Sequence, residues 1–325
     1  MATSAAVSIY SIRSAIIALF LMCLYLPEVD ADAVSWNYKA GESGGPEKWH
    51  AMYPDCGGVV QSPIDIQTKR VLYDPGLELF DFADYHTTSG VQMELENVGG
   101  HTAEVLFSGK EVFLKGGSLP NKYKLEQFHF HWGQDERRGS EHGLNGQHFP
   151  MEAHFVHSQY GLTNTSKAAE HPFGLAVVGF FFKIGKKNEQ YEQLLKYFKN
   201  ITEANQKIHI PTFPVIQLLP TSARLNYYRY QGSLTTPPCY ESVIWSVAED
   251  LIEISEDQIN KFRGLFDEES HQLVNDFRPV QNLNQRTVLS TSSAYRDTGR
   301  DSGSIVSPQI TMLVLAIVYH VTTLF

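Results

Sequence analysis

The chain has 325 residues, of which 42% are hydrophobic and 19% charged, and its formal net charge is -10. This length is sufficient to bury a large core, and it allows either two ordinary domains or one large β-rich domain. The negative charge argues against nucleic acid as a partner, because binding to phosphate backbones depends on Lys and Arg side chains that displace cations. The number of domains has to come from the order of elements along the chain.

Residues 1–33 have the organisation of a secretory signal peptide. Arg13 precedes an apolar run at 15–26, and the small residues Ala31 and Ala33 follow it. A membrane-spanning helix, the alternative interpretation, needs roughly 20 apolar residues and finds fewer here. We therefore expect the protein to enter the secretory pathway and to reside outside the cell, free or attached to the outer face of the plasma membrane.

Export changes the interpretation of the cysteines. Removal of the signal peptide takes away Cys23 and leaves Cys56 and Cys239. In an oxidising compartment this pair is expected to form one disulfide, with two buried free thiols as the alternative. The patterns that begin at Asn164 and Asn200 are acceptor sequences for glycosylation, which is consistent with export.

The C-terminal end combines a polar spacer with an apolar tail. Residues 290–309 are rich in Ser, Thr, Gly, Arg and Asp, and residues 310–325 form an apolar run with no basic segment after it. Small residues, spacer and tail in this order are typical of a lipid-anchor signal whose tail is later removed. A short membrane anchor and a fully secreted protein are the alternatives.

Between these ends, residues 34–289 form the expected single domain, because no low-complexity linker or internal repeat divides them. Two segments have helical patterns, 189–199 and 255–266, and the second starts with a capping box of Ser255 and Gln258. Segments with strand patterns are more numerous: 91–95, 104–107, 124–132, 151–157, 174–183 and 242–247. Strands that so rarely alternate with helices predict a mainly β domain rather than a doubly wound parallel sheet.

Two histidines share one face of a predicted strand. In the sequence QFHFHW at 127–132, His129 and His131 are two positions apart, so their side chains project from the same side. The alternating aromatic residues indicate that the opposite side packs into a core. Both imidazoles would then line a cavity and could reach one metal ion, whereas an exposed strand face is the alternative.

A third ligand is available on the next predicted strand. His154 and Glu152 share one face there, whereas His157 points to the other. From spacing alone, His142 and His148 also remain candidates. Three protein ligands and one open position are typical of catalytic zinc. Zinc lowers the pKa of bound water to about 7, which provides hydroxide at neutral pH without redox side reactions.

Two polar residues are candidate partners of these ligands. A ligating imidazole usually donates its second N–H to an oxygen, which fixes the tautomer and the direction of the ring. Gln127 shares a face with His129, and Glu152 shares one with His154. Both are expected to orient the neighbouring histidine, and the alternative is that they are solvated polar residues of a sheet.

Five motifs give a more specific interpretation. They are QSPIDI at 61–66, FHFHWG at 128–133, SEHG at 140–143, EAHFVH at 152–157 and GSLTTPPC at 232–239. In this order, over about residues 36–286, the sequence resembles the alpha-class carbonic anhydrases. The resemblance implies one domain around a twisted, mostly antiparallel ten-stranded sheet with short peripheral helices. It also implies zinc in a conical cleft and reversible hydration of carbon dioxide to bicarbonate and a proton by zinc-bound hydroxide.

The resemblance assigns roles to individual residues. It makes His129, His131 and His154 the zinc ligands. Thr235 would accept a hydrogen bond from the zinc-bound hydroxide and donate one to Glu141. Together these bonds would aim a lone pair of the hydroxide oxygen at the substrate. Carbon dioxide is uncharged, so a small apolar pocket suits it. The positions that match the family's substrate site are Val156, Val177, Leu234, Thr235, Thr236, Val243 and Trp245.

His101 matches the family's proton shuttle, and an imidazole accepts and releases protons near neutrality. Tyr38 and Asn97 fall where the resemblance places water-network residues. Cys56 and Cys239 fall where extracytoplasmic members carry a disulfide, which would also brace the TTPP loop. The resemblance does not predict an oligomeric state.

Two other interpretations compete with this enzyme. A carbonic-anhydrase-like domain without strong activity could serve as a binding ectodomain, although such domains typically lack at least one of the three histidines. The sequence GESGG at 41–45 formally fits the nucleophile elbow of hydrolases. That motif needs a strand before it and a helix after it, and Pro46 with the surrounding polar residues predicts neither.

Overall fold

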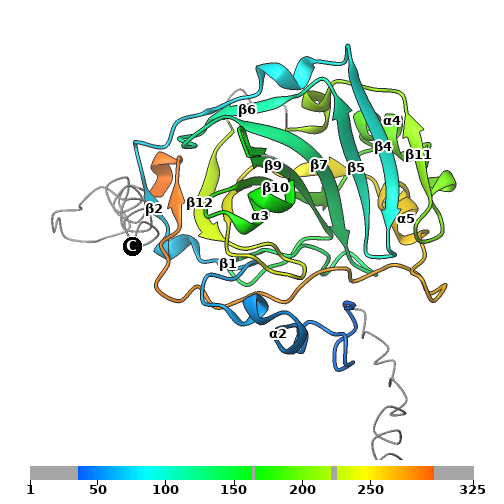
Figure 1. The fold of residues 1–325 in the computed structure, drawn as a ribbon, viewed down its shortest axis with the longest axis horizontal. Coiled ribbons are helices and arrows are strands. Elements are labelled where there is room, and N and C mark those ends of the chain that lie inside the picture. The colour runs from blue at the N-terminus through cyan, green and yellow to red at the C-terminus, as the bar shows by residue number, and fades with distance from the viewer. Residues whose placement is uncertain (1–35, 163–164, 221–224, 296–325) are drawn as a thin grey trace, which may run out of the picture.

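The computed structural model describes residues 36–162, 165–220 and 225–295, which fold around one large sheet (Figure 1). A continuous path of ten strands runs through this sheet. In spatial order they are β11 (Lys207–Ile210), β4 (Val91–Val98), β5 (Thr102–Gly109), β7 (Tyr123–Trp132), β9 (Met151–Gln159), β10 (Leu175–Ile184), β13 (Val243–Ala248), β12 (Tyr227–Gly232), β15 (Leu289–Ser290) and β2 (Leu72–Tyr73). The predicted mainly β fold is confirmed, and all six strands expected from the sequence are among these ten.

Most neighbouring strands in the path run antiparallel, as expected. The parallel pairs are β10 with β13 and β15 with β2. The additional short strands are β14 (Ile252–Ile254) on β10, β6 (Phe113–Gly116) on β7, β3 (Phe80–Asp81) on β6, and a separate pair of β1 (Asp65–Ile66) and β8 (Gly143–Leu144). These strands could not be predicted from the sequence, because segments of two to four residues carry too little alternation to be recognised.

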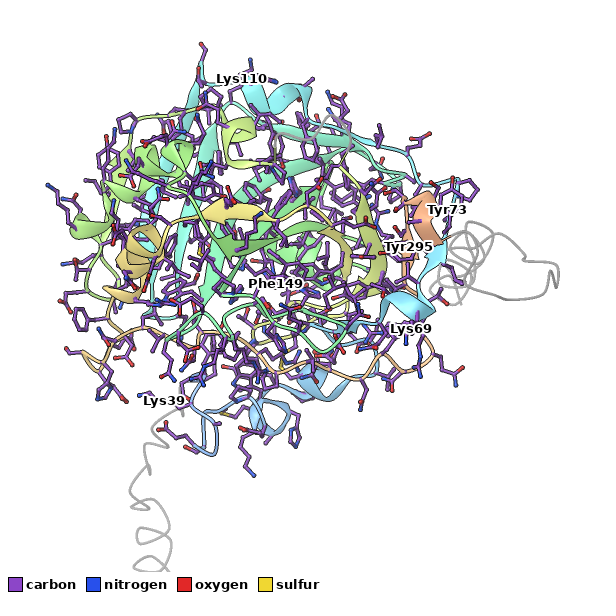
Figure 2. The ribbon with its side chains drawn as sticks, turned by 180° about the vertical axis from the view of Figure 1, so that it is seen from behind. Lys39, Lys69, Tyr73, Lys110, Phe149 and Tyr295 are labelled. Carbon is purple, nitrogen blue, oxygen red and sulfur yellow. A yellow bond between two sulfur atoms is a disulfide. The ribbon has the colours of Figure 1, made fainter. Side chains whose placement is uncertain are left out.

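The central strands are buried on both faces because each face has its own apolar core. Along β4 buried and more accessible residues alternate, whereas the first eight residues of β9 are all buried. Phe128 and Phe130 of β7 belong to one cluster, and Val156 of β9 belongs to the other. Phe149, labelled in Figure 2, lies in that second cluster, whereas Lys110 projects at the edge of the molecule.

The two predicted helices form, but both end earlier than the sequence pattern indicates. α5 (Glu256–Arg263) begins after Ser255, which forms the predicted capping box, and stops at Gly264, where the missing side chain favours an end. α4 (Glu189–Leu195) gives way to a 3-10 turn (Phe198–Asn200) that buries Phe198. The two other helices within the described residues are α2 (Trp49–Met52) and α3 (Thr165–Glu170).

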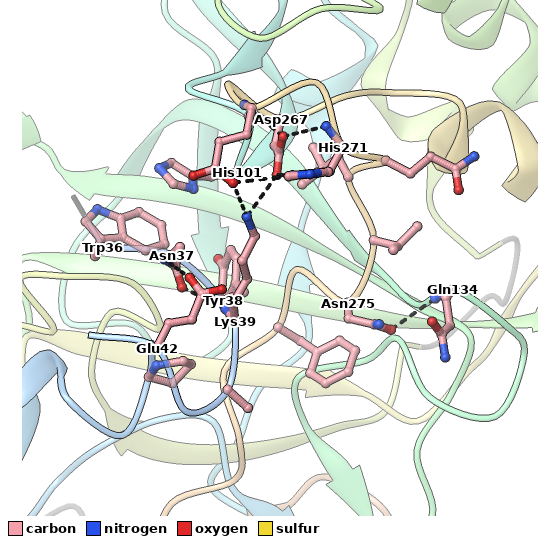
Figure 3. Close-up of a pocket in the computed structure, with 18 of the residues that line it drawn as sticks. Trp36, Asn37, Tyr38, Lys39, Glu42, His101, Gln134, Asp267, His271 and Asn275 are labelled. Atoms are coloured by element: carbon pink, nitrogen blue, oxygen red, sulfur yellow. Dashed lines mark hydrogen bonds and ion pairs between the residues drawn. The ribbon is translucent and has the colours of Figure 1, made fainter. Parts of the chain in front are cut away.

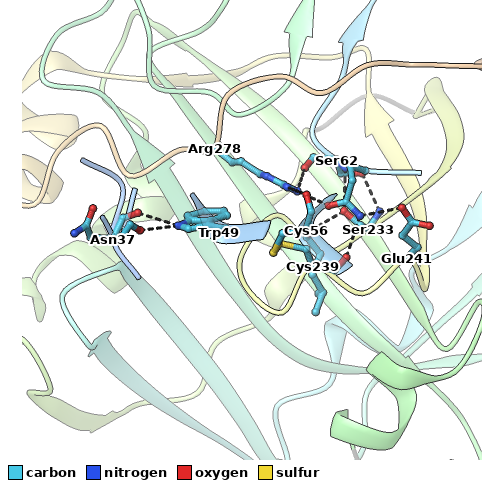
Figure 4. The surroundings of a disulfide bond; sticks show 11 residues. Asn37, Trp49, Cys56, Ser62, Ser233, Cys239, Glu241 and Arg278 are labelled. Carbon is cyan, nitrogen blue, oxygen red and sulfur yellow. Dashed lines mark hydrogen bonds between the residues drawn. A yellow bond between two sulfur atoms is a disulfide. The ribbon is translucent and has the colours of Figure 1, made fainter. Parts of the chain in front are cut away.

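A disulfide and a buried arginine fasten the N-terminal segment to the domain (Figure 4). Cys56 and Cys239 form the predicted bond. The Arg278 guanidinium donates hydrogen bonds to the Cys56 carbonyl at 2.9 Å and to the Gln61 side chain and the Ser62 carbonyl at 2.8 Å each. Because Cys239 directly follows the TTPP loop, the bond ties this loop to the N-terminal segment.

The folded domain continues past the predicted boundary at its C-terminal end. The strand β15 spans Leu289–Ser290, and the next turn (Ser293–Tyr295) brings the Tyr295 hydroxyl to 2.7 Å from that of Tyr228. The predicted signal peptide, the apolar tail and Asn164 lie outside the described residues. Among the helices of the described part, none has the length and apolar character needed to cross a membrane.

Loss of the disulfide should lower the stability of the domain. The bond joins residues that are 183 positions apart. Restricting so long a loop in the unfolded chain typically stabilises the folded state by about 2 to 5 kcal/mol. We expect Cys56→Ser/Cys239→Ser to unfold at a lower urea concentration than the wild type. Reductant should lower the urea concentration at which the wild type unfolds but should not change that of the variant. A wild type that is insensitive to reductant would contradict this expectation.

Candidate metal centre

The two histidine-bearing strands lie side by side at the centre of the sheet. β7 and β9 pair antiparallel, and His129 is directly opposite His154 in the register. His131, two positions after His129, faces the same side. The ring centroids lie 5.0 Å apart for His129 and His131, 5.2 Å for His129 and His154, and 4.7 Å for His131 and His154. Strand alternation and register together bring the three predicted ligands to one place.

Two of these imidazoles donate their outer N–H to the side chains expected from the sequence. His129 Nδ1 donates to the Gln127 amide oxygen at 2.8 Å. His154 Nε2 donates to the Glu152 carboxylate at 2.7 Å. Each bond occupies one ring nitrogen and leaves the other to face the neighbouring histidines.

His131 is oriented by a residue that the sequence analysis missed. Its Nδ1 donates to the backbone carbonyl of Asp276 at 2.6 Å. A backbone acceptor that lies far away in the chain carries no side-chain signal, so no pattern in the sequence could have revealed it. The remaining Nε2 of His131 is buried and has no hydrogen-bond partner within the described residues.

The three free nitrogens form a donor set that suits zinc. One nitrogen from each of His129, His131 and His154 lies within 4.8 Å of the others. Neutral imidazole is a preferred zinc ligand, and three ligands leave a coordination position open. The unpartnered, buried Nε2 of His131 supports this fit, because a buried polar atom without a partner costs about 1 to 3 kcal/mol.

Burial also keeps the imidazoles in the form that a metal binds. Burial lowers the pKa of His129 well below its ordinary value, and the charges of His131 and His154 add to this effect. Burial likewise lowers the pKa of His131. Because a metal binds the deprotonated ring nitrogen, a lowered pKa removes the competition from protons near neutral pH.

Glu152 supports a second histidine in addition to His154. His142 Nδ1 donates to the same carboxylate oxygen at 2.7 Å, and His142 Nε2 accepts from the Tyr230 hydroxyl at 2.6 Å. Burial would raise the pKa of Glu152, but His142 and His154 outweigh it and hold the pKa well below its usual range. Gly179 leaves room for this carboxylate, since a Cβ there would lie 3.2 Å from its oxygen.

The other candidate histidines have different surroundings. Donor atoms of His142, Glu152 and His154 also lie close together, but both ring nitrogens of His142 already take part in hydrogen bonds. His148 is half-buried and interacts with a backbone carbonyl at 3.2 Å. His157 points to the opposite side of β9, as predicted, where burial lowers its pKa to about 4.

Glu141 lies against His131 and His154 without the expected contact to Thr235. Its Oε1 accepts a hydrogen bond from the Arg278 backbone N–H at 2.8 Å. Its Oε2 is buried, lacks a hydrogen-bond partner in the described part of the chain, and lies 3.4 Å from His131 Nε2. Thr235 is also buried, at 5% exposure. The joint role of Thr235 and Glu141 therefore stays a prediction.

Most of the predicted substrate positions gather in one apolar cluster beside the ligands. The cluster contains Val156, Val177, Val243 and Trp245, and Leu234 packs against it. The Trp245 ring lies 4.8 Å from the ring of His154, which joins this apolar wall to the metal centre. Thr236, in the TTPP loop, is partly buried. The use of this wall by a substrate stays a prediction.

The predicted shuttle and water-network residues are only partly brought together (Figure 3). His101 stacks on Trp36 with ring centroids 3.9 Å apart, and the Tyr38 ring lies 6.3 Å from His101. Asn97 lies elsewhere: its side chain is buried and donates to the Phe266 carbonyl at 3.0 Å. The structure thus places Asn97 among backbone groups rather than with His101, because its position on β4 directs it into the protein.

A carboxyl group that the sequence analysis missed lies beside the first ligand. Glu104 on β5 is directly opposite His129 in the register, so both side chains face the same side. Burial, reinforced by the negative charge of Glu96, raises the pKa of Glu104 to about 7. The alternation of β5 could have indicated that Glu104 faces the site, but strand register cannot be deduced from the sequence.

The sheet and its three-histidine centre define a β domain that is able to hold a metal ion. Comparisons with known proteins identify its family. The model of the eukaryotic-type carbonic anhydrases matches residues 44–292. Carbonic anhydrase 7 of Homo sapiens is 38% identical over 266 residues, which cover 80% of this chain and 98% of that protein. Carbonic anhydrase 7 of Mus musculus is 37% identical with the same coverage. Carbonic anhydrase 12 of Homo sapiens is 31% identical over 293 residues, 87% of this chain and 81% of that protein.

The chain belongs to the eukaryotic-type carbonic anhydrase family. The resemblance found in the sequence is therefore confirmed, and the chain is an enzyme of the carbonic anhydrase type. This family generally depends on zinc and hydrates carbon dioxide, and the histidine triad of this chain is able to hold a metal ion.

Proposed function

We propose that this chain catalyses the reversible hydration of carbon dioxide with one zinc ion held by His129, His131 and His154. The observation that carries the proposal is the convergence of three imidazole nitrogens, one from each histidine. The second nitrogen of each ring already donates a hydrogen bond to an oxygen atom. When bound, zinc supplies a Lewis acid that makes water at its open position acidic near neutral pH. The side chains around the centre have to orient the reactants, exclude water and move the released proton.

Glu141 and Thr235 form the proposed orienting pair. Glu141 is fixed by the Arg278 backbone at 2.8 Å, and its second oxygen faces the histidines without a partner within the described residues. A threonine hydroxyl both donates and accepts a hydrogen bond. We propose that Thr235 donates to Glu141 and accepts from the nucleophile, so that one lone pair is directed at the substrate carbon.

The apolar wall beside His154 is the proposed binding surface for carbon dioxide. An uncharged molecule binds to apolar side chains with little loss of hydration, whereas the bicarbonate product is charged and favours water. Val156 and Trp245 belong to this wall, and Leu234 packs against it from the TTPP loop. The wall would also limit the access of water to the reacting carbon.

A binding ectodomain without strong activity is the alternative function. Such domains typically lack one or more of the metal-binding histidines, whereas this chain has all three in one place. The same observation therefore favours the enzyme.

We also propose that the enzyme acts outside the cytosol. The Cys56–Cys239 disulfide supports this location, because such bonds persist in oxidising compartments. Asn200, the described one of the two predicted glycosylation sites, is exposed. The predicted signal peptide and lipid-anchor tail complete this proposal, with a short membrane anchor or a fully secreted protein as alternatives.

Zinc content and activity should depend together on His129. We expect the purified wild type to hydrate carbon dioxide and to contain about one zinc ion per chain. His129→Ala removes one of three ligands and should reduce both zinc affinity and hydration by more than about 100-fold. His50→Ala, at an exposed histidine of α2, is the control and should retain both. A zinc-free, inactive wild type would overturn the proposed function.

The shuttle role of His101 predicts a dependence on buffer. In dilute buffer, His101→Ala should slow carbon dioxide hydration, because the centre then lacks a nearby group that exchanges protons near neutrality. Imidazole added to the solution should restore the rate by accepting the proton directly. Unchanged turnover of the variant in dilute buffer would remove His101 from the mechanism.

A further inference from the structure

A groove with a volume of about 1040 Å³ opens beside His101, on the side of the N-terminal segment (Figure 3). Trp36 and Lys39 line it from that segment, and Asp267 and His271 line it from the loop that follows α5. His101 is held at the groove by its stack on Trp36, with ring centroids 3.9 Å apart and planes 16° from parallel. The ring is therefore positioned to exchange protons with the contents of the groove.

The loop after α5 is packed directly against the turn that carries His101. A Cβ on Gly100 would lie only 2.6 Å from the Asp267 Cα, so glycine is needed for this close approach. Burial lowers the pKa of His101, whereas the charges of Glu268 and Asp267 act in the opposite direction. The carboxylates of the loop are therefore close enough to stabilise His101 once it carries a proton.

His271 is the outermost imidazole of this groove. Its Nδ1 lies 3.7 Å from the Asp267 carboxylate and 3.3 Å from the Glu269 carboxylate, and its side chain is 65% exposed. Lys39 faces the same two carboxylates from the N-terminal segment, with its Nζ 3.7 Å from Asp267 and 2.5 Å from Glu269. The imidazole thus lies between the carboxylates of the loop and the open solvent.

A bound metal is the less favourable use of these residues. Donor atoms of Asp267, Glu269 and His271 lie within 4.8 Å of one another. However, the Lys39 ammonium group already neutralises both carboxylates and would repel a divalent cation. A proton moves between these groups without displacing Lys39.

We propose that His271, held between Asp267 and Glu269, is a proton-relay residue that takes protons from His101 through the groove and delivers them to buffer. The inference rests on the proposed carbon dioxide hydration, which releases one proton in each turnover. An N–H bond of the His101 imidazolium breaks, and the proton crosses the solvent of the groove to the neutral His271 ring. A base in solution then removes it, so both imidazoles return to the neutral form.

The test compares His271→Ala with His209→Ala. His209 is a matched control, because it is 75% exposed and lies 3.5 Å from the Glu94 carboxylate, but it is on β11 and does not line the groove. In dilute buffer we expect His271→Ala to hydrate carbon dioxide about threefold more slowly than the wild type, since His101 still reaches solvent directly. His209→Ala should match the wild type, and concentrated imidazole should abolish the difference.

Oxygen-isotope exchange between carbon dioxide and water separates the relay from a structural effect. His271→Ala should leave the interconversion of carbon dioxide and bicarbonate at equilibrium unchanged and slow only the release of labelled water, which requires a proton. The relay alone would be overturned if His271→Ala and an active wild type had equal hydration rates in dilute buffer. It would also be overturned if the defect of the variant persisted in concentrated imidazole. A wild type without activity in any buffer would overturn both the relay and the proposed function.

Discussion

The metal centre depends on three hydrogen bonds that point away from it. Gln127, Glu152 and the Asp276 backbone each accept the outer N–H of one ligand, at 2.8, 2.7 and 2.6 Å. Without these acceptors the rings could rotate or change tautomer, and the inner nitrogens would no longer converge. The large sheet satisfies this constraint. The paired strands β7 and β9 supply the ligands in register, and the loop that leads to Arg278 supplies the third acceptor, the Asp276 carbonyl.

The charges around the centre indicate why a cation belongs there. Glu152 is kept anionic by two histidines, and Glu141 directs an oxygen without a hydrogen-bond partner in the described part toward His131. Burial, with the charge of Glu141 adding to it, raises the pKa of Asp276 well above its ordinary value, which favours the neutral form of this group. A buried negative charge is costly unless a positive group compensates it. A zinc ion at the three nitrogens would provide that compensation. Protonated imidazoles would not, because burial lowers the pKa values of His129 and His131 and favours their neutral form.

Sequence patterns predicted the parts of the site that lie within single strands. The pairs Gln127 with His129 and Glu152 with His154 follow from two-residue alternation. The disulfide follows from the two cysteines that would remain after the predicted removal of the signal peptide. What could not be predicted depends on register or on backbone groups: Glu104 opposite His129, and the Asp276 carbonyl beneath His131. The water-network role of Asn97 was implied by the resemblance alone, and in the structure its side chain donates to the Phe266 carbonyl.

Diffraction data collected on both sides of the zinc absorption edge, from crystals of the zinc-loaded protein, test the central claim most directly. The account predicts one strong anomalous peak about 2.0 to 2.1 Å from His129 Nε2, His131 Nε2 and His154 Nδ1, the three nitrogens left free by the outer hydrogen bonds. A principal peak at His142 and Glu152, or at His271 and Asp267, would contradict it. Absence of any peak from the histidine centre would contradict it as well.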